Sequence, residues 1–273
     1  MSGSFSVFGG SGFIGSAVAD ALERRQCRVI RINRTNWPEA GSDLGHVIFT
    51  IGMTADFRNR LVETVETQIL RVHEALTRYR FSSFLYLSSA RIYAGASSTR
   101  EDTPIPVRSW DVDHVYNISK LAGESLCFAL QNPMVRVVRL SNVYGTPDKS
   151  NLFLTAVMRE AVMNGIVTIG QAPQSSKDYI RVEEAAEAIV RVAREGRQQL
   201  YNIAAGQNMS HADIAEILRK AGYEVVFKDG GAVAEFPPID TARFTDEFRT
   251  KPSDARKNIS GVLKELQQLR ASR

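Results

Sequence analysis

Three glycines at intervals of three residues follow the first β-rich run of this chain, in the segment "FGGSGFIG". The strand expected over 5–9 leads into this segment, and a helical pattern over 12–25 begins within it. Glycine permits a tight turn, lets a phosphate approach the backbone, and lets the helix pack closely on the strand. The turn could have structural duties alone. Its position nevertheless predicts a dinucleotide site, held by the amides at the helix start and formed by Gly9, Gly12, Phe13, Ile14 and Gly15.

The rest of the first 140 residues alternates short β-rich runs with amphipathic helical patterns. This alternation is typical of a parallel sheet that is covered by helices on both faces. We therefore predict an α/β fold with a Rossmann-type, doubly wound parallel sheet. The expected strands are residues 5–9, 27–33, 46–52, 84–90 and 135–141, and the helices between them cover 12–25, 58–80 and 111–131.

The pattern of elements changes after Gly145. Helices are expected near 151–164, within "YIRVEEAAEAIVRVARE", after Ser210 as the N-cap, and from about 253 onward. No low-complexity linker separates these elements from the first part. The prediction is a dinucleotide-binding Rossmann domain of residues 1–145, which residues 179–205 rejoin, and a small C-terminal substrate-binding lobe of residues 146–178 and 206–273.

The end of the second expected strand bears on the choice of cofactor. An acidic residue there would accept hydrogen bonds from the free 2'-hydroxyl of an NAD ribose. This chain has Asn33 and Arg34 instead, and the planar guanidinium of Arg34 could pair with a 2'-phosphate. Arg34 could also be merely solvated. We predict that Asn33 and Arg34 contact the cofactor and that NADP is preferred, with NAD possible.

A tyrosine and a lysine stand four residues apart in "YNISK", ahead of an apolar helical stretch. At this spacing Tyr116 and Lys120 leave the same face of a helix. A nearby ammonium favours the ionised phenol, which can exchange a proton with a substrate hydroxyl or carbonyl. An incidental pair on a surface helix is the other interpretation, so the pair gains weight only from the motifs around it.

Composition excludes several classes of protein. The net charge of +4 comes from scattered basic residues, which gives no support for nucleic-acid binding but suits an anionic small molecule. The two cysteines, Cys27 and Cys127, lie in apolar segments and resemble reduced core residues of a cytoplasmic protein. We expect no signal peptide at the start, no membrane span and no metal site.

Four motifs now stand in order: the glycine turn, "YLSSARIY", "YNISK" and "RLSNVYG". Together they resemble the extended short-chain dehydrogenase/reductases, specifically the NAD(P)-dependent nucleotide-sugar epimerase/dehydratase family. The segments "REDTPIPV", "KDYIRVEEAAEAI" and "LYNIAAGQNMSHADIAEIL" resemble further stretches of that family, so the likeness runs through most of the chain.

The resemblance implies a role for each matching residue. Tyr116 would be the general acid or base, and Lys120 would lower its pKa and hold the nicotinamide ribose. Ser89 would orient the substrate oxygen, although a serine at a strand end could simply cap a loop. Asn142 would lie near the nicotinamide and the substrate phosphate. Lys177 stands where the family usually has an arginine that contacts the nucleotide diphosphate, so the charge is kept but bidentate geometry is not.

Two departures from the family concern the adenine side. Only "RTNWPEAGSDLG" separates the second and third expected strands, where the family usually has a helix and another strand, with an aspartate near the adenine. We expect that this unit is absent here. In addition, "MTADF" follows the third strand where small residues line the cofactor, and the usual asparagine on the next helix is missing.

The residues after Ser89 bear on the reaction. A sugar dehydratase of this family has an Asp-Glu pair there, whereas this chain has Ala90 and Arg91, which disfavours dehydration. We expect an NAD(P)-dependent reductase of a 4-keto-6-deoxy sugar nucleotide. The alternatives are a nucleotide-sugar 4-epimerase with NAD and a non-catalytic NADP-sensing regulator.

The resemblance also implies a homodimer. Helices 58–80 and 111–131 resemble the pair that forms a four-helix interface in this family, although their apolar residues are equally consistent with packing on the sheet. The expected specificity loops are 93–115, 146–152, 171–178 and 229–245. Arg243 in the last loop could touch a diphosphate, but it is more simply interpreted as a residue on a helix surface.

Overall fold

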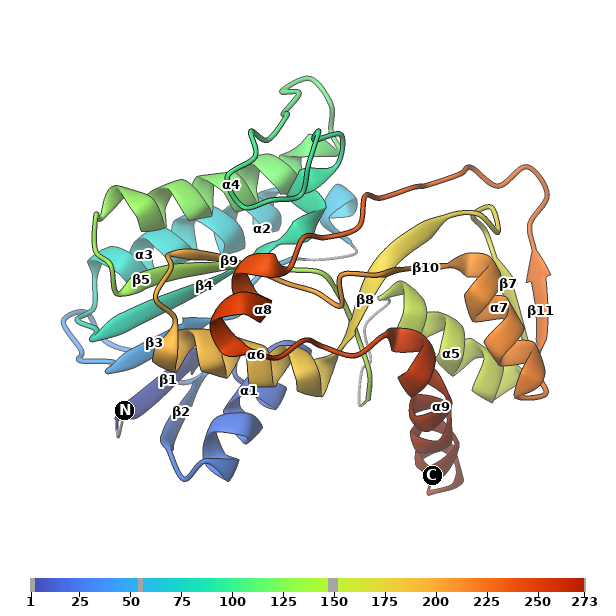
Figure 1. The fold of residues 1–273 in the computed structure, drawn as a ribbon. Helices are drawn as coiled ribbons and strands as arrows, with labels where there is room; N and C mark the ends of the chain where they lie inside the picture. Colours follow the sequence, from blue (N-terminus) through green and yellow to red (C-terminus); the bar gives the residue numbers. More distant parts are fainter. Residues whose placement is uncertain (1–2, 54–55, 147–151, 273) are drawn as a thin grey trace.

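A six-stranded parallel sheet forms the centre of the computed structural model, which describes residues 3–53, 56–146 and 152–272 (Figure 1). Its strand order is β2-β1-β3-β4-β5-β9, and every neighbouring pair is parallel. The predicted fold class is confirmed. The strands are β1 (Ser4–Phe8), β2 (Arg28–Ile32), β3 (His46–Phe49), β4 (Ser83–Ser89), β5 (Val135–Leu140) and β9 (Leu200–Ile203).

Helices cover both faces of this sheet (Figure 1). Helices α1 (Phe13–Arg24) and α6 (Val182–Glu195) pack with Val7 of β1 into one apolar core. The next residue, Phe8, points to the opposite face and joins a second core with α3 (Arg71–Thr77) and α4 (His114–Ala129). Because consecutive strand residues face opposite sides, a strand buried on both faces reads as a continuous apolar run.

Strand β2 lies at the edge of the sheet, with β1 as its neighbour. The chain then crosses from β2 to β3 on the other side of β1, and residues 33–45 form no helix or strand of the central sheet. The expectation that a helix and a strand are absent at this point is therefore confirmed.

The region expected as one helix over 58–80 is instead divided, so this prediction was wrong in detail. A short 3₁₀ segment, η1 (Phe57–Asn59), precedes α2 (Leu61–Val65), and a π-helical turn, η2 (Glu66–Leu70), separates α2 from α3. The π turn contains Gln68, whose buried amide donates to the Met53 carbonyl over 2.9 Å and accepts from the Ser119 hydroxyl at 2.8 Å. These two bonds fix the turn between α4 and the segment after β3.

The remaining elements surround a third apolar core, made mainly from α5, β7, β8, α7, β11 and α9. Ser210 caps α7 in a reciprocal arrangement with Asp213, as its sequence position predicted. The elements are η3 (Ala90–Tyr93), β6 (Asn142–Tyr144), α5 (Phe153–Asn164), β7 (Ile166–Ile169), β8 (Ser176–Arg181), β10 (Asn208–Ser210), α7 (His211–Lys220), β11 (Glu224–Phe227), α8 (Ala242–Phe248) and α9 (Ala255–Ala271).

Helix α8 begins inside the expected loop 229–245, where Arg243 alone was interpreted as a helix residue. Its Phe244 is buried in the core under the central sheet, on the face of α1 and α6. In the described part of the chain, the helices are too short or too polar to cross a bilayer.

Candidate active site

The glycine turn has the geometry of a phosphate-binding loop. Gly9 has a φ of +76°, which favours glycine, and its carbonyl accepts from the Gly12 amide at 2.8 Å. A Cβ on Gly15 would lie 2.1 Å from the Gly9 carbonyl oxygen, so α1 can pack this closely only with glycine there. Helix α1 begins after Gly12 without a side-chain cap, which leaves the amides of Phe13 and Ile14 at an uncapped helix start.

The two residues predicted to contact the adenine ribose of the cofactor, Asn33 and Arg34, differ in whether their side chains already have partners in the protein. The Asn33 side-chain oxygen accepts from the Thr35 amide at 2.8 Å and from the Thr35 hydroxyl at 2.7 Å, so it stabilises the local turn. Arg34 is exposed and has no carboxylate partner among the described residues. Arg34 is therefore an exposed positive charge just after the end of β2, whereas the Asn33 side chain is used in the turn.

Residues 50–52 connect the glycine turn to the predicted catalytic lysine. The Thr50 hydroxyl donates to the Phe8 carbonyl over 2.7 Å and lies against Gly9 and Gly15. Two residues later, a Cβ on Gly52 would come within 3.1 Å of the Lys120 ammonium nitrogen. Because the strands are parallel, their carboxyl ends share one edge of the sheet, and this edge carries both features.

The structure brings Ser89, Tyr116 and Lys120 together at that edge. Ser89 ends β4, and Tyr116 lies in the first turn of α4, where the Ser89 hydroxyl acts to lower the pKa of the phenol. Lys120 lies one turn further along α4 and donates to the Leu87 carbonyl over 2.8 Å. All three residues therefore lie at the carboxyl end of β4, and both Tyr116 and Lys120 are buried.

The electrostatics of Tyr116 differ from the expectation. Burial raises the pKa of Tyr116 above its ordinary value of 10, while the Ser89 hydroxyl and the charge of Arg91 act in the opposite direction. Burial lowers the pKa of Lys120 to about 8, although Glu124 counteracts part of this effect. Lys120 would then lose its proton before the phenol does. Lys120 is not among the groups that shift the pKa of Tyr116 here, so its effect on the phenol stays a prediction.

Arg91 was noted in the sequence only as a residue that is not acidic, and its position was missed. Its guanidinium carbon lies 5.7 Å from the centre of the Tyr116 ring and 5.0 Å from the centre of the Phe57 ring. Arg58 lies over the same Phe57 ring at 4.7 Å, but it is paired with Asp113 at 2.7 Å.

The other two predicted substrate residues, Asn142 and Lys177, lie on neighbouring strands of a separate three-stranded sheet, β10-β8-β6. Asn142 of β6 donates to the Asp178 carbonyl over 2.8 Å and remains exposed. Lys177 of β8 is half-buried, 5.9 Å from the Phe153 ring centre. Burial lowers the pKa of Lys177, and the charges of Arg91 and Arg58 lower it further. Most of the predicted loop 146–152 lies outside the described residues.

A buried network of hydrogen bonds next to the site joins β4, α4 and β5. Glu124, one turn beyond Lys120, accepts from the Ser88 hydroxyl at 2.5 Å and pairs with Arg139 at 2.7 Å. Arg139 also donates to the Tyr93 hydroxyl over 2.8 Å. A buried charge needs such partners. Arg243, for which diphosphate contact was considered, donates instead to the Leu200 carbonyl over 3.0 Å and braces β9.

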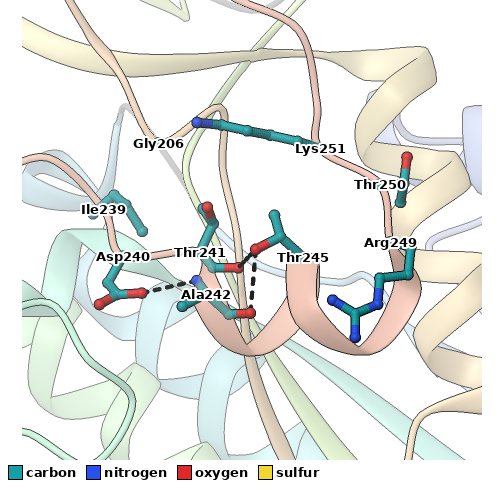
Figure 2. A pocket seen from close by; sticks show the side chains of 9 residues that line it. All are labelled: Gly206, Ile239, Asp240, Thr241, Ala242, Thr245, Arg249, Thr250 and Lys251. Atoms are coloured by element: carbon teal, nitrogen blue, oxygen red, sulfur yellow. Dashed lines mark hydrogen bonds between the residues drawn. The ribbon is translucent and has the colours of Figure 1, made fainter.

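A hollow of about 510 Å³ lies elsewhere, between the turn at Gly206 and helix α8 (Figure 2). Its nine lining residues include none of the predicted site residues. Figure 2 shows Thr245 bonded back to the start of its own helix, through contacts to the Thr241 and Ala242 carbonyls. The hollow is wide open to solvent and does not contain the catalytic candidates.

Solved structures with this fold extend over almost the whole chain. The UDP-glucuronic acid 4-epimerase from Bacillus cereus, in complex with UDP-glucuronic acid and NAD, has a TM-score of 0.80 at 17% identity, with 97% of this chain and 99% of that chain covered. RMD from Pseudomonas aeruginosa, complexed with NADPH, has a TM-score of 0.78 at 21% identity and the same coverage. The NAD-dependent NDP-hexosamine 5,6-dehydratase TunA has a TM-score of 0.78 at 18% identity, with 97% of each chain covered.

No curated protein matches this sequence. One family model does match, over residues 56–204, which is more than half of the chain. The matched part runs from η1 to the end of β9 and includes Ser89, Tyr116, Lys120, Asn142 and Lys177. The chain therefore belongs to the NAD-dependent epimerase/dehydratase family.

Proposed function

We propose that this chain is an NAD(P)-dependent oxidoreductase that acts on a nucleotide-activated sugar and reduces its 4-keto group. One observation carries the proposal: Tyr116 and Ser89 lie at the same sheet edge as the glycine turn, with Lys120 one helical turn away from Tyr116. This arrangement can hold a carbonyl oxygen against two hydroxyl groups beside a bound nicotinamide.

Each residue of the site then has a distinct role. The cofactor supplies a hydride to the carbonyl carbon when it is bound. Ser89 orients the carbonyl oxygen, and Tyr116 donates the proton to that oxygen. Lys120, with its three ammonium donors and one bond to the Leu87 carbonyl, has donors left to hold the nicotinamide ribose.

The pyrophosphate of the cofactor would rest on the uncapped start of α1, at Gly9, Gly12, Phe13, Ile14 and Gly15. Arg34 supports a preference for NADP, because it is an unpaired cation at the end of β2 and could pair with a 2'-phosphate. NAD remains the second candidate. RMD is a structure of the same fold that holds NADPH, whereas the B. cereus epimerase holds NAD.

The edge position of β2 supports reduction over epimerisation. A reductase must exchange its cofactor in every turnover, whereas a 4-epimerase returns the hydride and can keep its cofactor bound. Since β2 is the end strand of the sheet, no other strand of the described chain would flank the adenosine side of the site. A 6-deoxy sugar is our first candidate substrate, as the sequence suggested, because Arg91 replaces the acid that would act on C6 in dehydration.

The C-terminal lobe, residues 146–178 and 206–273, would bind the nucleotide sugar. Lys177 of this lobe supports the assignment, since the charges of Arg91 and Arg58 act on it and lower its pKa. We also propose a homodimer through α2, η2 and α4. These elements expose five apolar side chains: Leu61, Val62, Val65, Leu70 and Ile118.

Fluorescence of bound NADPH and NADH, followed by consumption of NADPH with a panel of 4-keto sugar nucleotides, tests the proposal. Replacing Tyr116 with phenylalanine should lower turnover by about 10²- to 10⁴-fold while leaving cofactor binding intact. Interconversion of 4-epimers without net NADPH consumption would establish the epimerase instead. Cofactor binding without turnover of any sugar in the panel would favour the regulator.

A further inference from the structure

We infer that the imidazole of His211, beside Lys177, hydrogen-bonds the nucleoside diphosphate part of the substrate in the C-terminal lobe. The inference rests on the proposed function, which makes the substrate a sugar nucleotide. It deepens that function by naming a residue that determines how tightly the nucleotide is held. His211 is the first residue of α7, and no sequence motif pointed to it.

His211 is a buried imidazole without a hydrogen-bond partner. Its side chain is 0% exposed, and neither Nδ1 nor Nε2 is paired with any of the described residues. A neutral imidazole has one donor and one acceptor, and each buried polar atom that stays unpaired costs free energy. An apolar side chain would avoid this cost, so the ring is suited to a partner that comes from outside the chain.

Lys177 lies close to this ring. The His211 amide donates to the Ser175 carbonyl over 2.8 Å, and β10 pairs with β8 in a register that places Met209 opposite Lys177. The Phe153 ring contacts both side chains. Its centre is 4.4 Å from the centre of the His211 ring, which it stacks on, and 5.9 Å from the Lys177 ammonium nitrogen. The ammonium and the imidazole are therefore held beside one aromatic ring.

The charges of the two side chains define what they can bind. No carboxylate among the described residues forms a salt bridge with Lys177. Burial and, to a smaller extent, the charge of Lys177 lower the pKa of His211 to about 4, so the ring is neutral near pH 7. The pair therefore offers one ammonium group, one imidazole N–H donor and one acceptor nitrogen.

A nucleoside diphosphate matches this set of groups. Its phosphate oxygens can accept from the Lys177 ammonium and from the imidazole N–H. Its ribose hydroxyls can donate to the other ring nitrogen of His211. Inorganic pyrophosphate has the phosphate oxygens but no ribose hydroxyl, so it would leave that nitrogen unpaired and should bind more weakly.

The main chain at the start of α7 cannot take the place of these side chains. Its first three amides already donate to the Ser175 and Pro173 carbonyls and to the Ser210 hydroxyl. Phe153 is the first residue of α5 and is only partly buried, so its ring can turn outward without disturbing the helix. The ligand then reaches the edge of the His211 ring from the side of Phe153.

NMR of the ring nitrogens, in the full chain with ¹⁵N-labelled histidine, tests the contact directly. The chain has four histidines, and His211→Phe identifies the resonances of interest. The probes are UDP, dTDP and GDP. Saturation with the probe that binds most tightly should shift both ring nitrogens of His211. The exposed His73 of α3 should not respond.

Calorimetry with the same probe measures the contribution of each side chain. His211→Leu and His211→Phe should each weaken binding by about ten- to a hundredfold, and Lys177→Met should act in the same direction. His211→Leu should also raise the urea midpoint of the free chain, because two unpaired polar atoms are removed. His73→Leu is the matched control and should leave the affinity unchanged.

Unchanged affinity in both His211 variants would overturn the inference, and is the result expected if an ordered water satisfied the ring. Unshifted His211 nitrogens at saturation, or no binding of any of the three nucleotides, would also overturn it. The proposed function fails separately. Nucleotide binding through His211, without consumption of NADPH on any keto-sugar nucleotide of the panel, would exclude the reductase and leave this site in place.

Discussion

The ammonium nitrogen of Lys120 lies 2.8 Å from the main-chain carbonyl oxygen of Leu87, two residues before Ser89 on β4. This bond ties the helix that carries Tyr116 to the strand that carries Ser89. It also anchors a charged group that is only 5% exposed. The position of Lys120 therefore has an energetic consequence as well as a proposed catalytic one.

Replacing Lys120 with methionine should stabilise the chain at neutral pH while abolishing activity. The pKa of Lys120 is about 8 in the folded chain against an ordinary value of 10.5, so keeping it protonated in the folded state costs free energy below pH 8. The gain in the free energy of unfolding should be about 1–3 kcal/mol, since the Leu87 carbonyl loses its partner. Urea denaturation at pH 7 measures it.

The same difference in pKa fixes the pH dependence of that gain. Between the two values the unfolded chain binds more protons than the folded chain, so this lysine destabilises less as the pH rises from about 8 to 10.5. The advantage of Lys120→Met should therefore shrink over this window. A gain that grew with pH would contradict the assignment of a buried, partly deprotonated lysine.

Gly15→Ala should remove cofactor binding and destabilise the fold. The new Cβ would lie 2.1 Å from the Gly9 carbonyl oxygen, and α1 would have to move away from β1. We expect a loss of about 3 kcal/mol in stability and at least tenfold weaker NAD(P)H binding. Gly170→Ala is the control, because a Cβ there meets nothing within 4 Å. Equal effects of the two substitutions would show that the turn has no special role.

Arg34→Gln should weaken NADPH binding by about ten- to a hundredfold, because a charge-assisted hydrogen bond to a phosphate contributes roughly 1.5–3 kcal/mol. NADH binding should change little. The exposed Arg28, at the opposite end of β2, provides the control substitution Arg28→Gln. Fluorescence titrations with both cofactors compare the variants, and an unchanged NADPH affinity would remove the basis of the NADP preference.

Val62→Asp should convert a homodimer into a monomer. Val62 is 78% exposed on α2, within the apolar group proposed as the interface. A charge buried between two copies would be unpaired and strongly unfavourable. Val233→Asp, at a 58% exposed valine outside these helices, should leave the assembly intact. Sedimentation at micromolar concentration decides, and a monomeric wild-type chain would exclude the dimer.

The sequence was most informative where short-range geometry dictates the structure. The spacing of Gly9, Gly12 and Gly15 describes the turn directly, since a Cβ at each position would clash with or crowd a neighbouring atom. The apolar runs gave the central strands, because both faces of a parallel sheet are buried. Parallel strands also end at one edge of the sheet, which explains why the sequence alone places Ser89 near Tyr116.

It was least informative where tertiary contacts decide. A regular helical pattern cannot reveal the π turn around Gln68, which depends on bonds to Met53 and Ser119. Helix α8 is held by Phe244 in a distant core, so the sequence placed its first residues in a loop rather than in a helix. Arg91 was missed as a contributor for a similar reason, because its distance to Tyr116 depends on how η3 meets α4.

The absence of a helix and a strand between β2 and β3 leaves β2 as the end strand of the central sheet. An end strand presents unpaired amides and carbonyls that another chain could extend, which is a common origin of aggregation. Here β2 carries Arg28 and Arg31, and Arg31 is anchored by Asp20 and Glu23 of α1. A strand of another molecule could pair with β2 only if these charges lost their hydrating water, which costs free energy. The charged residues of β2 therefore protect the shortened sheet against aggregation.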